Sequence, residues 1–408
     1  MSPKHVALTQ FSVRNDCLQI GNLSLTRLAQ RVGTTPFYAY DRKIITERIR
    51  MLRRHLPNDI HLHYAMKANP MVAVVQHLAK LVDGIDVASV GEMGVALDTA
   101  MPPEKISFAG PAKTKDELSC AIAAGIVLNM ESEQEMEYIA RLGESLSIRP
   151  KVAIRVNPDF ELKSAGMKMG GGSQQFGIDA ECVPVILARV DALKLDFEGF
   201  HIFSGSQNLS AAAIQEAHNK ALLLGIRLAD YAPQPVRRLN IGGGFGIPYF
   251  PGEQALDLAS IGKNLHRLLP AVKQQLPESR IVIELGRYIV AEAGIYVCRV
   301  MERKISRGRV FLITNGGLHH HLAASGNFGQ IIRKNFPVAV GNKIQGFERE
   351  VVSVVGPLCT PLDLLADRME MAKAEVGDLI VVFQSGAYGL SASPTAFLSH
   401  PVPKEVLV

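Results

Sequence analysis

Lys67 is the first residue whose position suggests chemistry, because it follows a short apolar segment and precedes a turn signal, Asn69-Pro70. The apolar segment, residues 60–66, is typical of a buried strand that would deliver the lysine at its C-terminal end. An amine held there against an apolar wall has a lowered pKa and can attack carbonyl groups. Taken alone, the stretch is more typical of a surface lysine at the start of a loop. The assignment therefore depends on the rest of the chain.

A glycine-rich turn, Gly242-Gly-Gly-Phe-Gly246, follows another short apolar segment. The backbone N–H groups of such a turn can bind a phosphate. The turn is not a Gly-x-Gly-x-x-Gly motif with a helix and an acidic residue about 20 positions on, as a dinucleotide site requires. We therefore expect a lone phosphate group at this turn.

Polar side chains end further apolar segments, namely Asp86, Arg155, His201 and Glu284. A lysine able to form a Schiff base, a phosphate-binding turn and a carboxylate to pair with a ring nitrogen together describe a site for pyridoxal 5′-phosphate. Each residue alone has a simpler interpretation. His201 is as typical of a hydrogen-bonded core histidine, and Glu284-Leu-Gly-Arg287 of a surface salt bridge.

Eight short apolar segments alternate with mostly helical patterns and predict the strands that position these residues. The expected strands are 60–66, 85–88, 106–109, 126–130, 152–156, 197–203, 239–241 and 281–284. They are too continuously apolar to be half-exposed antiparallel strands. Eight βα units in about 240 residues suit a (β/α)8 barrel, whose active-site residues come from the C-terminal ends of several strands. A doubly wound open sheet is the alternative, but it usually has fewer strands.

After Glu284, short alternating runs separated by Gly and Pro predict a second, mostly β domain that is sandwich-like or barrel-like. The N-terminal residues read as two short strands and a helix capped by Ser24, and we expect them to complete this domain. The predicted division is a barrel at residues 37–280 that binds pyridoxal phosphate, and a β domain at residues 1–36 and 281–408.

The composition is that of an ordinary globular protein, with 408 residues, 47% hydrophobic and 20% charged. The net charge of +5 is mild and no long basic run occurs, so nucleic-acid binding is not indicated. The five cysteines are scattered and lack metal-ligand spacing, which suits reduced thiols in a cytoplasmic protein. No signal peptide or membrane-spanning stretch is recognisable, so no membrane association is expected.

Eight motifs in chain order resemble those of the fold-type III pyridoxal-phosphate decarboxylases. This family includes the diaminopimelate, ornithine and arginine decarboxylases, and its barrel is similar to that of alanine racemase. The motifs are Pro36-Phe-Tyr-Ala-Tyr-Asp41, Tyr64-Ala-Met-Lys67-Ala-Asn69, Asp86-Val-Ala-Ser-Val-Gly-Glu92, His201-Ile-Phe-Ser204-Gly205-Ser206, Gly242-Gly-Gly-Phe-Gly246, Glu284-Leu-Gly-Arg287, Gly356-Pro-Leu-Cys359-Thr-Pro-Leu-Asp363 and Gly386-Ala-Tyr388-Gly389. Any one motif is weak evidence, but all eight in order are specific.

The resemblance implies roles for residues of the barrel. Lys67 would hold the cofactor as a Schiff base, His201 would lie against its ring, and Glu284 would pair with the ring nitrogen. Ser204 and the glycines of the turn would contact the phosphate. The other residues expected to contact the cofactor are Asp86 and Arg155, and the glycines are Gly242, Gly243 and Gly244.

The resemblance also implies roles for the second domain. Arg287 would lie near phosphate and substrate, and Tyr388 would close the phosphate site and contact substrate. Cys359 would return a proton to the α-carbon as a general acid, although a lone cysteine is more typical of a buried apolar residue. In this family the cysteine loop reaches the partner subunit's site, so a homodimer with shared active sites is implied.

Two positions depart from diaminopimelate decarboxylases and bear on the substrate. Thr360 replaces the acidic residue that binds the distal ammonium, and Ala323 replaces the arginine that binds the distal carboxylate. A site without these partners should not bury two distal charges, so free diaminopimelate is not expected. Ornithine and lysine are doubtful, although Asp363 can still contact an amine.

The Cys-Thr-Pro-Leu-Asp variant is similar to specialised members that act on conjugated amino acids, such as an aminoacyl group on a carrier protein or a siderophore intermediate. We therefore expect an α-decarboxylase of an L-amino acid or a conjugated amino acid. The alternatives are a diaminopimelate or basic amino-acid decarboxylase, an amino-acid racemase and a non-enzymatic cofactor carrier. The carrier has little beyond its barrel, whereas this chain continues long after Glu284.

His319-His-His321 raises the question of a metal site. Three adjacent histidines cannot all point the same way, and zinc sites prefer other spacings, so we expect no metal. We expect a loop near the dimer interface or the substrate entrance instead. The following Gly326-Asn-Phe-Gly329 favours a mobile turn.

Overall fold

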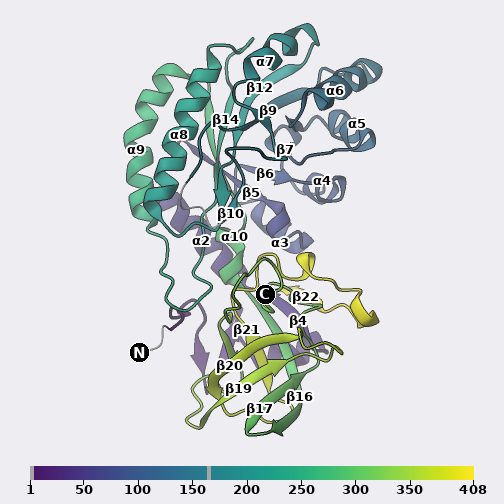
Figure 1. Cartoon of the computed structure of the whole chain (residues 1–408), viewed down its shortest axis with the longest axis vertical. Coiled ribbons are helices and arrows are strands. Elements are labelled where there is room, and N and C mark those ends of the chain that lie inside the picture. Colours follow the sequence, from purple (N-terminus) through teal and green to yellow (C-terminus); the bar gives the residue numbers. More distant parts are fainter. Residues whose placement is uncertain (1–3, 163–166) are drawn as a thin grey trace. The chain divides into compact units, whose positions relative to one another are not determined.

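The computed structural model describes residues 4–162 and 167–408, and the chain divides into two compact units (Figure 1). The barrel unit comprises Arg48–Gly246 and Leu256–Gly286. The β unit comprises Met1–Glu47, Ile247–Ala255 and Arg287–Val408. Among the described residues, no helix combines the length and the apolar character needed to cross a membrane.

Eight parallel strands form the closed sheet of the barrel unit, and most of their residues are buried. In spatial order they are β5 (Ile60–Ala65), β6 (Gly84–Val87), β7 (Ile106–Phe108), β8 (Val127–Met130), β9 (Lys151–Asn157), β12 (Asp196–Ile202), β14 (Arg238–Gly243) and β15 (Arg280–Leu285). β15 pairs back to β5, and β8 pairs with β9. The predicted (β/α)8 barrel is therefore confirmed, because each expected segment supplies one strand. Three two-residue strands accompany the sheet: β10 (Met167–Lys168) pairs with β13 (Gly205–Ser206), and β11 (Ile178–Asp179) with β9.

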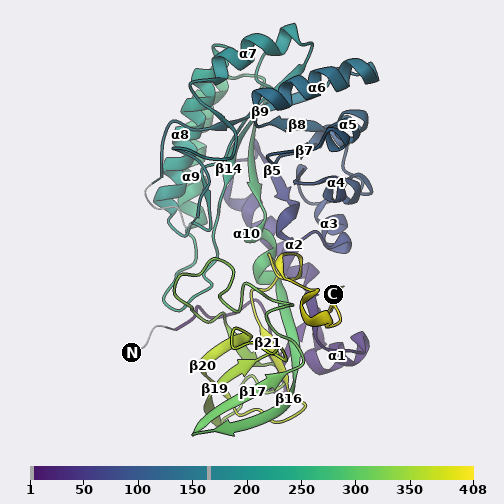
Figure 2. The same ribbon diagram turned by 45° about the vertical axis from the view of Figure 1, so that its right-hand side comes forward.

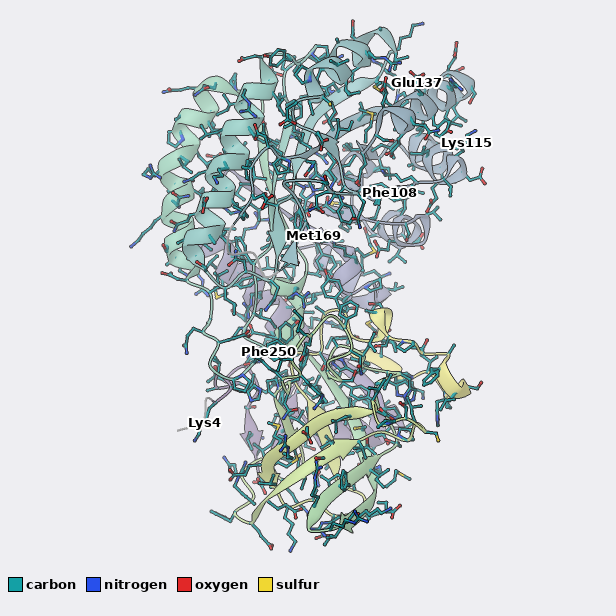
Figure 3. All side chains as sticks on the ribbon, viewed as in Figure 1. Lys4, Phe108, Lys115, Glu137, Met169 and Phe250 are labelled. Carbon is teal, nitrogen blue, oxygen red and sulfur yellow. The ribbon has the colours of Figure 1, made fainter. Side chains whose placement is uncertain are left out.

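Helices follow the barrel strands along the chain. They are α2 (Arg42–His55), which leads into β5, α3 (Val72–Leu78), α4 (Val90–Leu97), α5 (Lys115–Ala124), α6 (Glu133–Leu146), α7 (Val183–Ala192), α8 (Ala211–Ala229) and α9 (Leu258–Gln275). Figure 2 shows α3 to α6 stacked one above another along one side of the strands. Side-chain oxygens of Ser89, Thr114, Ser132, Ser210 and Asp257 accept backbone N–H groups at helix starts. Phe108 lies in the packed interior of this unit, whereas Lys115 is on its outer side (Figure 3).

The β unit contains a small sheet, one N-terminal helix and a larger sheet. β1 (Val13–Arg14), β2 (Cys17–Ile20) and β3 (Leu23–Ser24) form the small sheet, and α1 (Leu25–Val32) follows. The larger sheet consists of β4 (Phe37–Tyr40), β16 (Gly294–Ser306), β17 (Arg309–Thr314), β18 (Val338–Val340), β19 (Arg349–Val355), β20 (Leu364–Ala372), β21 (Leu379–Val382) and β22 (Lys404–Leu407). The mostly β character expected for this part of the chain is confirmed. Its core joins α1 to the larger sheet through Leu25, Leu28, Phe37, Val297 and Val381.

The long strand β16 organises the larger sheet. Residues 294–297 pair with β4, residues 296–299 pair with β21 on the other side, and residues 300–306 pair with β17. Because β4 also pairs with β22, residues 37–40 belong to the β unit. The barrel unit therefore begins later in the sequence than the expected residue 37. An apolar run such as Phe37–Tyr40 does not indicate which sheet its strand joins.

Short turns complete the described structure, and one of them replaces an expected strand. The alternating run at residues 288–301 predicts a strand, but its first residues form α10 (Arg287–Val290) and η3 (Ala291–Ala293), and the strand β16 begins at Gly294. A short buried apolar run does not distinguish helix from strand, which explains the difference. The other 3₁₀ turns are η1 (Met66–Ala68), η2 (Pro103–Lys105), η4 (Leu390–Ala392) and η5 (Phe397–Ser399).

Candidate active site

The glycine-rich turn at the end of β14 has backbone positions that only glycine fits well. Gly242 and Gly244 have φ values of 75° and 73°, in the left-handed region. A Cβ at Gly243 would overlap the carbonyl oxygen of Glu284, and one at Gly244 would overlap that of Gly205. The turn therefore lies tightly against β13 and β15, and its glycines allow a close backbone approach.

Glu284 on β15 is a buried carboxylate beside this turn. Its Oε2 accepts a hydrogen bond from Nδ2 of Asn240 at 2.9 Å and lies 3.1 Å from Nε2 of His201, within ion-pair distance. Burial alone would raise the pKa of Glu284. The charges of His201 and Lys67 and the hydrogen bond from Asn240 outweigh burial, so the pKa is lowered. Glu284 is therefore an anion at neutral pH and is suited to pair with a cationic ring nitrogen.

His201 on β12 is buried beside Glu284. Its Nε2 faces Oε2 of Glu284 at 3.1 Å, and its Nδ1 has no hydrogen-bond partner within the part of the chain that the structure describes. Its ring centroid lies 6.5 Å from that of Phe203. Ser204 follows directly after β12, and its backbone oxygen accepts the amide of Met169 at 3.2 Å. A buried imidazole of this kind is suited to packing against a flat ring.

Lys67 lies in η1, directly after β5, and its side chain is exposed. Phe203 supplies part of the apolar wall expected from the sequence, since its ring centroid is 5.7 Å from Nζ. Lys67 is exposed because β5 ends at Ala65 and the 3₁₀ turn η1 carries the lysine beyond the strand. The amine still acts on its surroundings, since its charge lowers the pKa of Glu284.

Asp86 on β6 belongs to a chain of polar side chains from neighbouring strands. Its Oδ1 lies 3.0 Å from Nδ1 of His63 and accepts a hydrogen bond from Oγ of Ser107 at 2.6 Å. Ser107 in turn accepts Nδ2 of Asn129 at 3.2 Å. Oδ2 of Asp86 is buried and has no donor among the described residues. Asp86 thus orients His63 through Oδ1, while its Oδ2 can still accept a hydrogen bond from a group other than the described residues.

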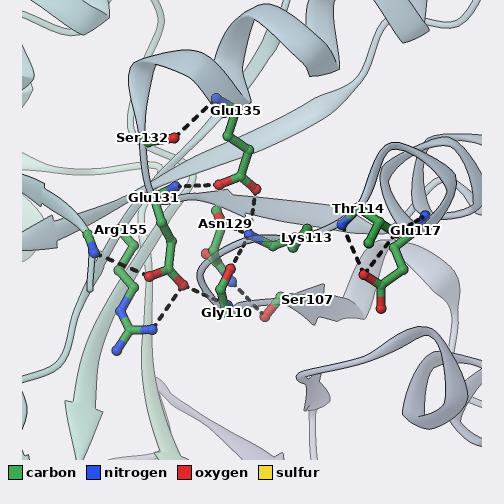
Figure 4. Close-up of polar contacts among 11 residues, drawn as sticks. Ser107, Gly110, Lys113, Thr114, Glu117, Asn129, Glu131, Ser132, Glu135 and Arg155 are labelled. Carbon is green, nitrogen blue, oxygen red and sulfur yellow. Dashed lines mark hydrogen bonds and ion pairs between the residues drawn. The ribbon is translucent and has the colours of Figure 1, made fainter. Parts of the chain in front are cut away.

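Arg155 on β9 is held by Glu131, which directly follows β8 (Figure 4). Nη1 and Oε1 are 3.0 Å apart, and both side chains are buried. The Glu131 carboxylate also accepts the amides of Gly110 at 2.6 Å and Gly177 at 3.2 Å. Glu131 therefore fixes one face of Arg155 and two neighbouring loops at once.

A second buried ion pair, Lys113 with Glu135, contacts the backbone near and at Glu131 (Figure 4). Nζ of Lys113 lies 2.5 Å from Oε1 of Glu135 and also donates to the carbonyl oxygens of Gly110 and Asn129. Oε2 of Glu135 accepts the amide of Glu131 at 2.9 Å. The four charged side chains of this network are thus connected by hydrogen bonds through the Gly110 and Glu131 backbone.

Arg287 and Tyr388 lie together in the β unit. The guanidinium carbon of Arg287 is 4.6 Å from the ring centroid of Tyr388 and 5.5 Å from that of Tyr249. Nη1 of Arg287 also donates to Oη of Tyr249 at 3.0 Å. Tyr388 has a φ of 51°, which is uncommon for a residue other than glycine. Tyr249 is therefore a third member of this cluster.

Residues 356–363, the cysteine loop, expose Cys359 and bury Asp363. Oδ1 of Asp363 accepts the amide of Leu318 at 2.6 Å, and Oδ2 accepts the amide of Leu358 at 2.8 Å. The expected contact between Asp363 and a substrate amine does not fit this arrangement, because both carboxylate oxygens bind backbone amides inside the β unit. Thr360 is neutral, and its Oγ1 accepts the amide of Leu362 at 3.3 Å.

The three adjacent histidines are buried inside the β unit. His320 contacts the carbonyl oxygen of Pro401 at 3.0 Å, and His321 contacts Oγ of Ser385 at 2.9 Å. Burial lowers the pKa of His319 and His321 to about 3 and that of His320 to about 4, so the rings are neutral at pH 7. Among the described residues, no group of three or more His, Cys, Asp or Glu is arranged to hold a metal ion. The rings therefore pack the β unit, which the sequence did not indicate.

The candidate residues that the sequence analysis missed share one signal. They are buried polar residues in or directly after apolar strands: His63, Ser107, Asn129, Glu131 and Asn240. A buried polar group must find a hydrogen-bond partner, so each such residue in an expected barrel strand points to a polar network. Tyr249 carried no comparable signal, because it lies outside the expected strands.

Comparisons with known proteins agree along nearly the whole chain. The family model for the pyridoxal-dependent decarboxylase, pyridoxal binding domain, matches residues 42–291. An L-glutamyl acyl-carrier-protein decarboxylase from Niallia circulans is 38% identical over 400 residues, covering 96% of this chain and 92% of the relative. A Staphylococcus aureus decarboxylase, named for a 2-hydroxybutanedioate bearing an L-alanin-3-ylcarbamoylmethyl group, is 31% identical and covers 90% of this chain and 92% of its own.

A solved structure supports the same assignment. The crystal structure of diaminopimelate decarboxylase from M. jannaschii in complex with L-lysine has a TM-score of 0.86 and 27% identity to this chain. The match covers 98% of this chain and 92% of that one. Both units described above are therefore shared with a decarboxylase of known structure.

Glu284→Gln should destabilise the apo protein most at neutral pH. The pKa of Glu284 in the folded protein lies below its value of about 4.3 in the unfolded chain. The ionised carboxylate therefore stabilises the folded state fully above about pH 4.3, and this stabilisation is lost as the pH falls toward the pKa in the folded protein. We expect a melting temperature a few degrees below that of the parent at pH 7, since each kcal/mol of lost stability lowers it by about 1 °C in a chain of 408 residues. The difference in melting temperature between the parent and Glu284→Gln should become smaller below about pH 5. Thermal unfolding followed by circular dichroism from pH 7 to 4 measures it, with the exposed Glu144→Gln as control. A gap that stays constant with pH would contradict the assignment.

Glu131→Gln should cost about 3–5 kcal/mol of unfolding free energy, because it leaves the buried Arg155 without its counter-charge. Glu133→Gln is the matched control. Glu133 lies two residues from Glu131 and pairs with the more exposed Arg189, which also pairs with Glu137, so this change should cost about 0–1 kcal/mol. Urea denaturation of both variants gives the comparison. Equal small losses would show that the Glu131 pair does not hold Arg155 in place.

Proposed function

The chain belongs to the family of pyridoxal-phosphate-dependent amino-acid decarboxylases, and from this premise we propose that it decarboxylates an L-amino acid conjugated through its side chain to a larger group. One observation carries the proposal. The cysteine loop offers no free carboxylate beside Cys359, since Thr360 is neutral and both oxygens of Asp363 accept backbone amides. A distal ammonium of lysine, ornithine or diaminopimelate would therefore find no partner there, and burying it unpaired is costly.

The position expected to bind a distal carboxylate is also neutral. Ala323 occupies it and is half-buried in the β unit. A conjugated side chain carries no charge at the point of linkage, so it does not require either partner. The names of the relatives from Niallia circulans and Staphylococcus aureus, a carrier-bound glutamyl group and a carbamoyl-linked alaninyl group, support this substrate class.

The barrel unit has the groups that pyridoxal phosphate needs. When bound, the cofactor supplies an electron sink for the electron pair left at the α-carbon after CO₂ departs. Lys67 would hold it through the amine, and the buried anion Glu284 would keep its ring nitrogen protonated. His201, which is buried beside Glu284, would pack against the ring, and the turn at Gly242, Gly243 and Gly244 would bind the phosphate.

The remaining roles are assigned to the β unit. The thiol of Cys359 is exposed and would give a proton to the α-carbon. Arg287 and Tyr388 would bind phosphate and substrate. We propose that these groups act across a homodimer with shared active sites. We also propose a cytoplasmic location, supported by the five cysteines, which are all free thiols.

The substrate class can be tested with purified holoenzyme and a panel of compounds. A γ-linked L-glutamyl conjugate, as an amide or a carrier thioester, should be decarboxylated with a kcat/KM at least about 100-fold above that of free L-lysine or diaminopimelate. Free L-glutamate is the matched control for the linkage. Measured CO₂ release excludes racemisation. Fastest turnover of diaminopimelate would refute the proposed substrate class.

Cys359→Ala should lower kcat for product formation by about 100-fold or more, the usual contribution of a general acid. Cys120→Ala is the control, because Cys120 is also exposed but lies on α5 of the barrel unit. Product and CO₂ are quantified together with the best substrate from the panel. Full turnover by Cys359→Ala would remove the proton-donor role.

A further inference from the structure

Asp363 fastens the cysteine loop to a second segment of the β unit. Its two oxygens accept the amides of Leu318 and Leu358 at 2.6 and 2.8 Å, and the side chain is 3% exposed. Leu318 directly precedes the three buried histidines, whereas Leu358 directly precedes Cys359. One carboxylate therefore joins two segments that lie 40 positions apart in the sequence (318 and 358).

Two glycines leave room for this carboxylate. A Cβ at Gly317 would overlap Oδ1 of Asp363, and a Cβ at Gly356 would overlap Oδ2. Neither glycine has a positive φ, so the need for glycine comes from the close approach alone. The backbones of both segments thus close directly on the Asp363 carboxylate.

The cysteine loop is also closed on itself around Asp363. The amide of Gly356 donates to the backbone oxygen of Asp363 at 3.1 Å, and the amide of Asp363 donates to that of Thr360 at 3.2 Å. The amide of Thr360 donates to the oxygen of Leu358 at 2.8 Å. Cys359 therefore sits between two residues whose backbones are hydrogen-bonded, while its own thiol is exposed.

Burying the Asp363 carboxylate costs free energy, because it removes the charge from water. Within the described residues no lysine or arginine forms an ion pair with Asp363, so the two amides are its main compensation for burial. Burial raises the pKa of Asp363, and the two hydrogen bonds and His400 oppose that rise. Because the carboxylate accepts hydrogen bonds from backbone amides, it fixes the conformation of the cysteine loop.

We propose that Asp363 is a positioning residue for Cys359. It holds the amide of Leu358 and thereby sets where the neighbouring thiol is presented, instead of contacting substrate. The proposal rests on the proposed function of Cys359 as the proton donor. A displacement of about 1 Å is enough to reduce catalysis strongly, so the effect of loosening the loop is measurable.

The test is Asp363→Asn, in which one oxygen becomes an NH₂ group that cannot accept an amide N–H. In the holoenzyme we expect kcat to fall at least about tenfold with KM within about threefold. The alkylation rate of Cys359 by iodoacetamide, relative to Cys120 in the same molecule, should change at least about threefold by peptide mass mapping. Asp378→Asn is the matched control, since Asp378 is also a buried β-unit aspartate that accepts a backbone amide, at Glu375.

The outcomes separate this proposal from the proposed function. If Cys359→Ala inactivates the enzyme but Asp363→Asn keeps parental kcat and alkylation rate, the positioning role is refuted and the function stands. If Cys359→Ala stays active, the function fails, and the alkylation rate still decides whether Asp363 positions the thiol. Equal effects of Asp363→Asn and Asp378→Asn would indicate general destabilisation and refute the proposal.

Two further measurements apply if Asp363→Asn does not fold. Gly317→Ala displaces the carboxylate from the opposite segment and should reproduce the change in Cys359 alkylation. In the unaltered protein, the Leu358 amide should exchange slowly with deuterium because it donates to a buried carboxylate. Exchange of that amide at the rate of an unstructured peptide would overturn the proposal.

Discussion

The pairing of β8 with β9 is the interaction on which the barrel unit depends. It aligns Leu128, Asn129 and Met130 with Val152, Ala153 and Ile154, and it turns an eight-stranded parallel sheet into a closed one. In a closed parallel sheet the C-terminal strand ends form a ring at one face of the barrel. β5 also pairs with β15 in this sheet, and the charge of Lys67, two residues after the end of β5, lowers the pKa of Glu284 on β15.

The same seam carries the buried pair of Glu131 and Arg155. Glu131 directly follows β8 and Arg155 lies on β9, so the charges meet only when the two strands pair. Buried ion pairs contribute little net stability but leave a costly charge behind when broken. The network around Glu131 therefore makes an incorrectly closed sheet expensive, in addition to holding an arginine at the rim.

The barrel and the residues at its strand ends could be predicted from the sequence because each depends on local patterns. The eight apolar runs, the turn at Gly242 and the position of Glu284 after its strand are all visible within a few residues. The surroundings of side chains could not be predicted, since they depend on contacts distant in sequence. Asp363 appeared available to a substrate amine, but its partner Leu318 lies 45 positions earlier. The sequence places Lys67 against an apolar wall, but it does not show that the 3₁₀ turn after β5 leaves the lysine exposed. The apolar run Phe37–Tyr40 is typical of a strand, yet nothing local assigns that strand to the sheet containing β16 and β22.

The position of β4 has a consequence for the order in which the chain folds during synthesis. β4 lies between β16 and β22, and β22 occupies Lys404–Leu407, at the end of the chain. The ribosome makes the whole barrel unit before either partner of β4 exists. At about 5–20 residues per second, this N-terminal strand waits on the order of half a minute for β22. A chain released early can thus contain every barrel strand yet leave the edge of β4 open to other strands, a known route to aggregation.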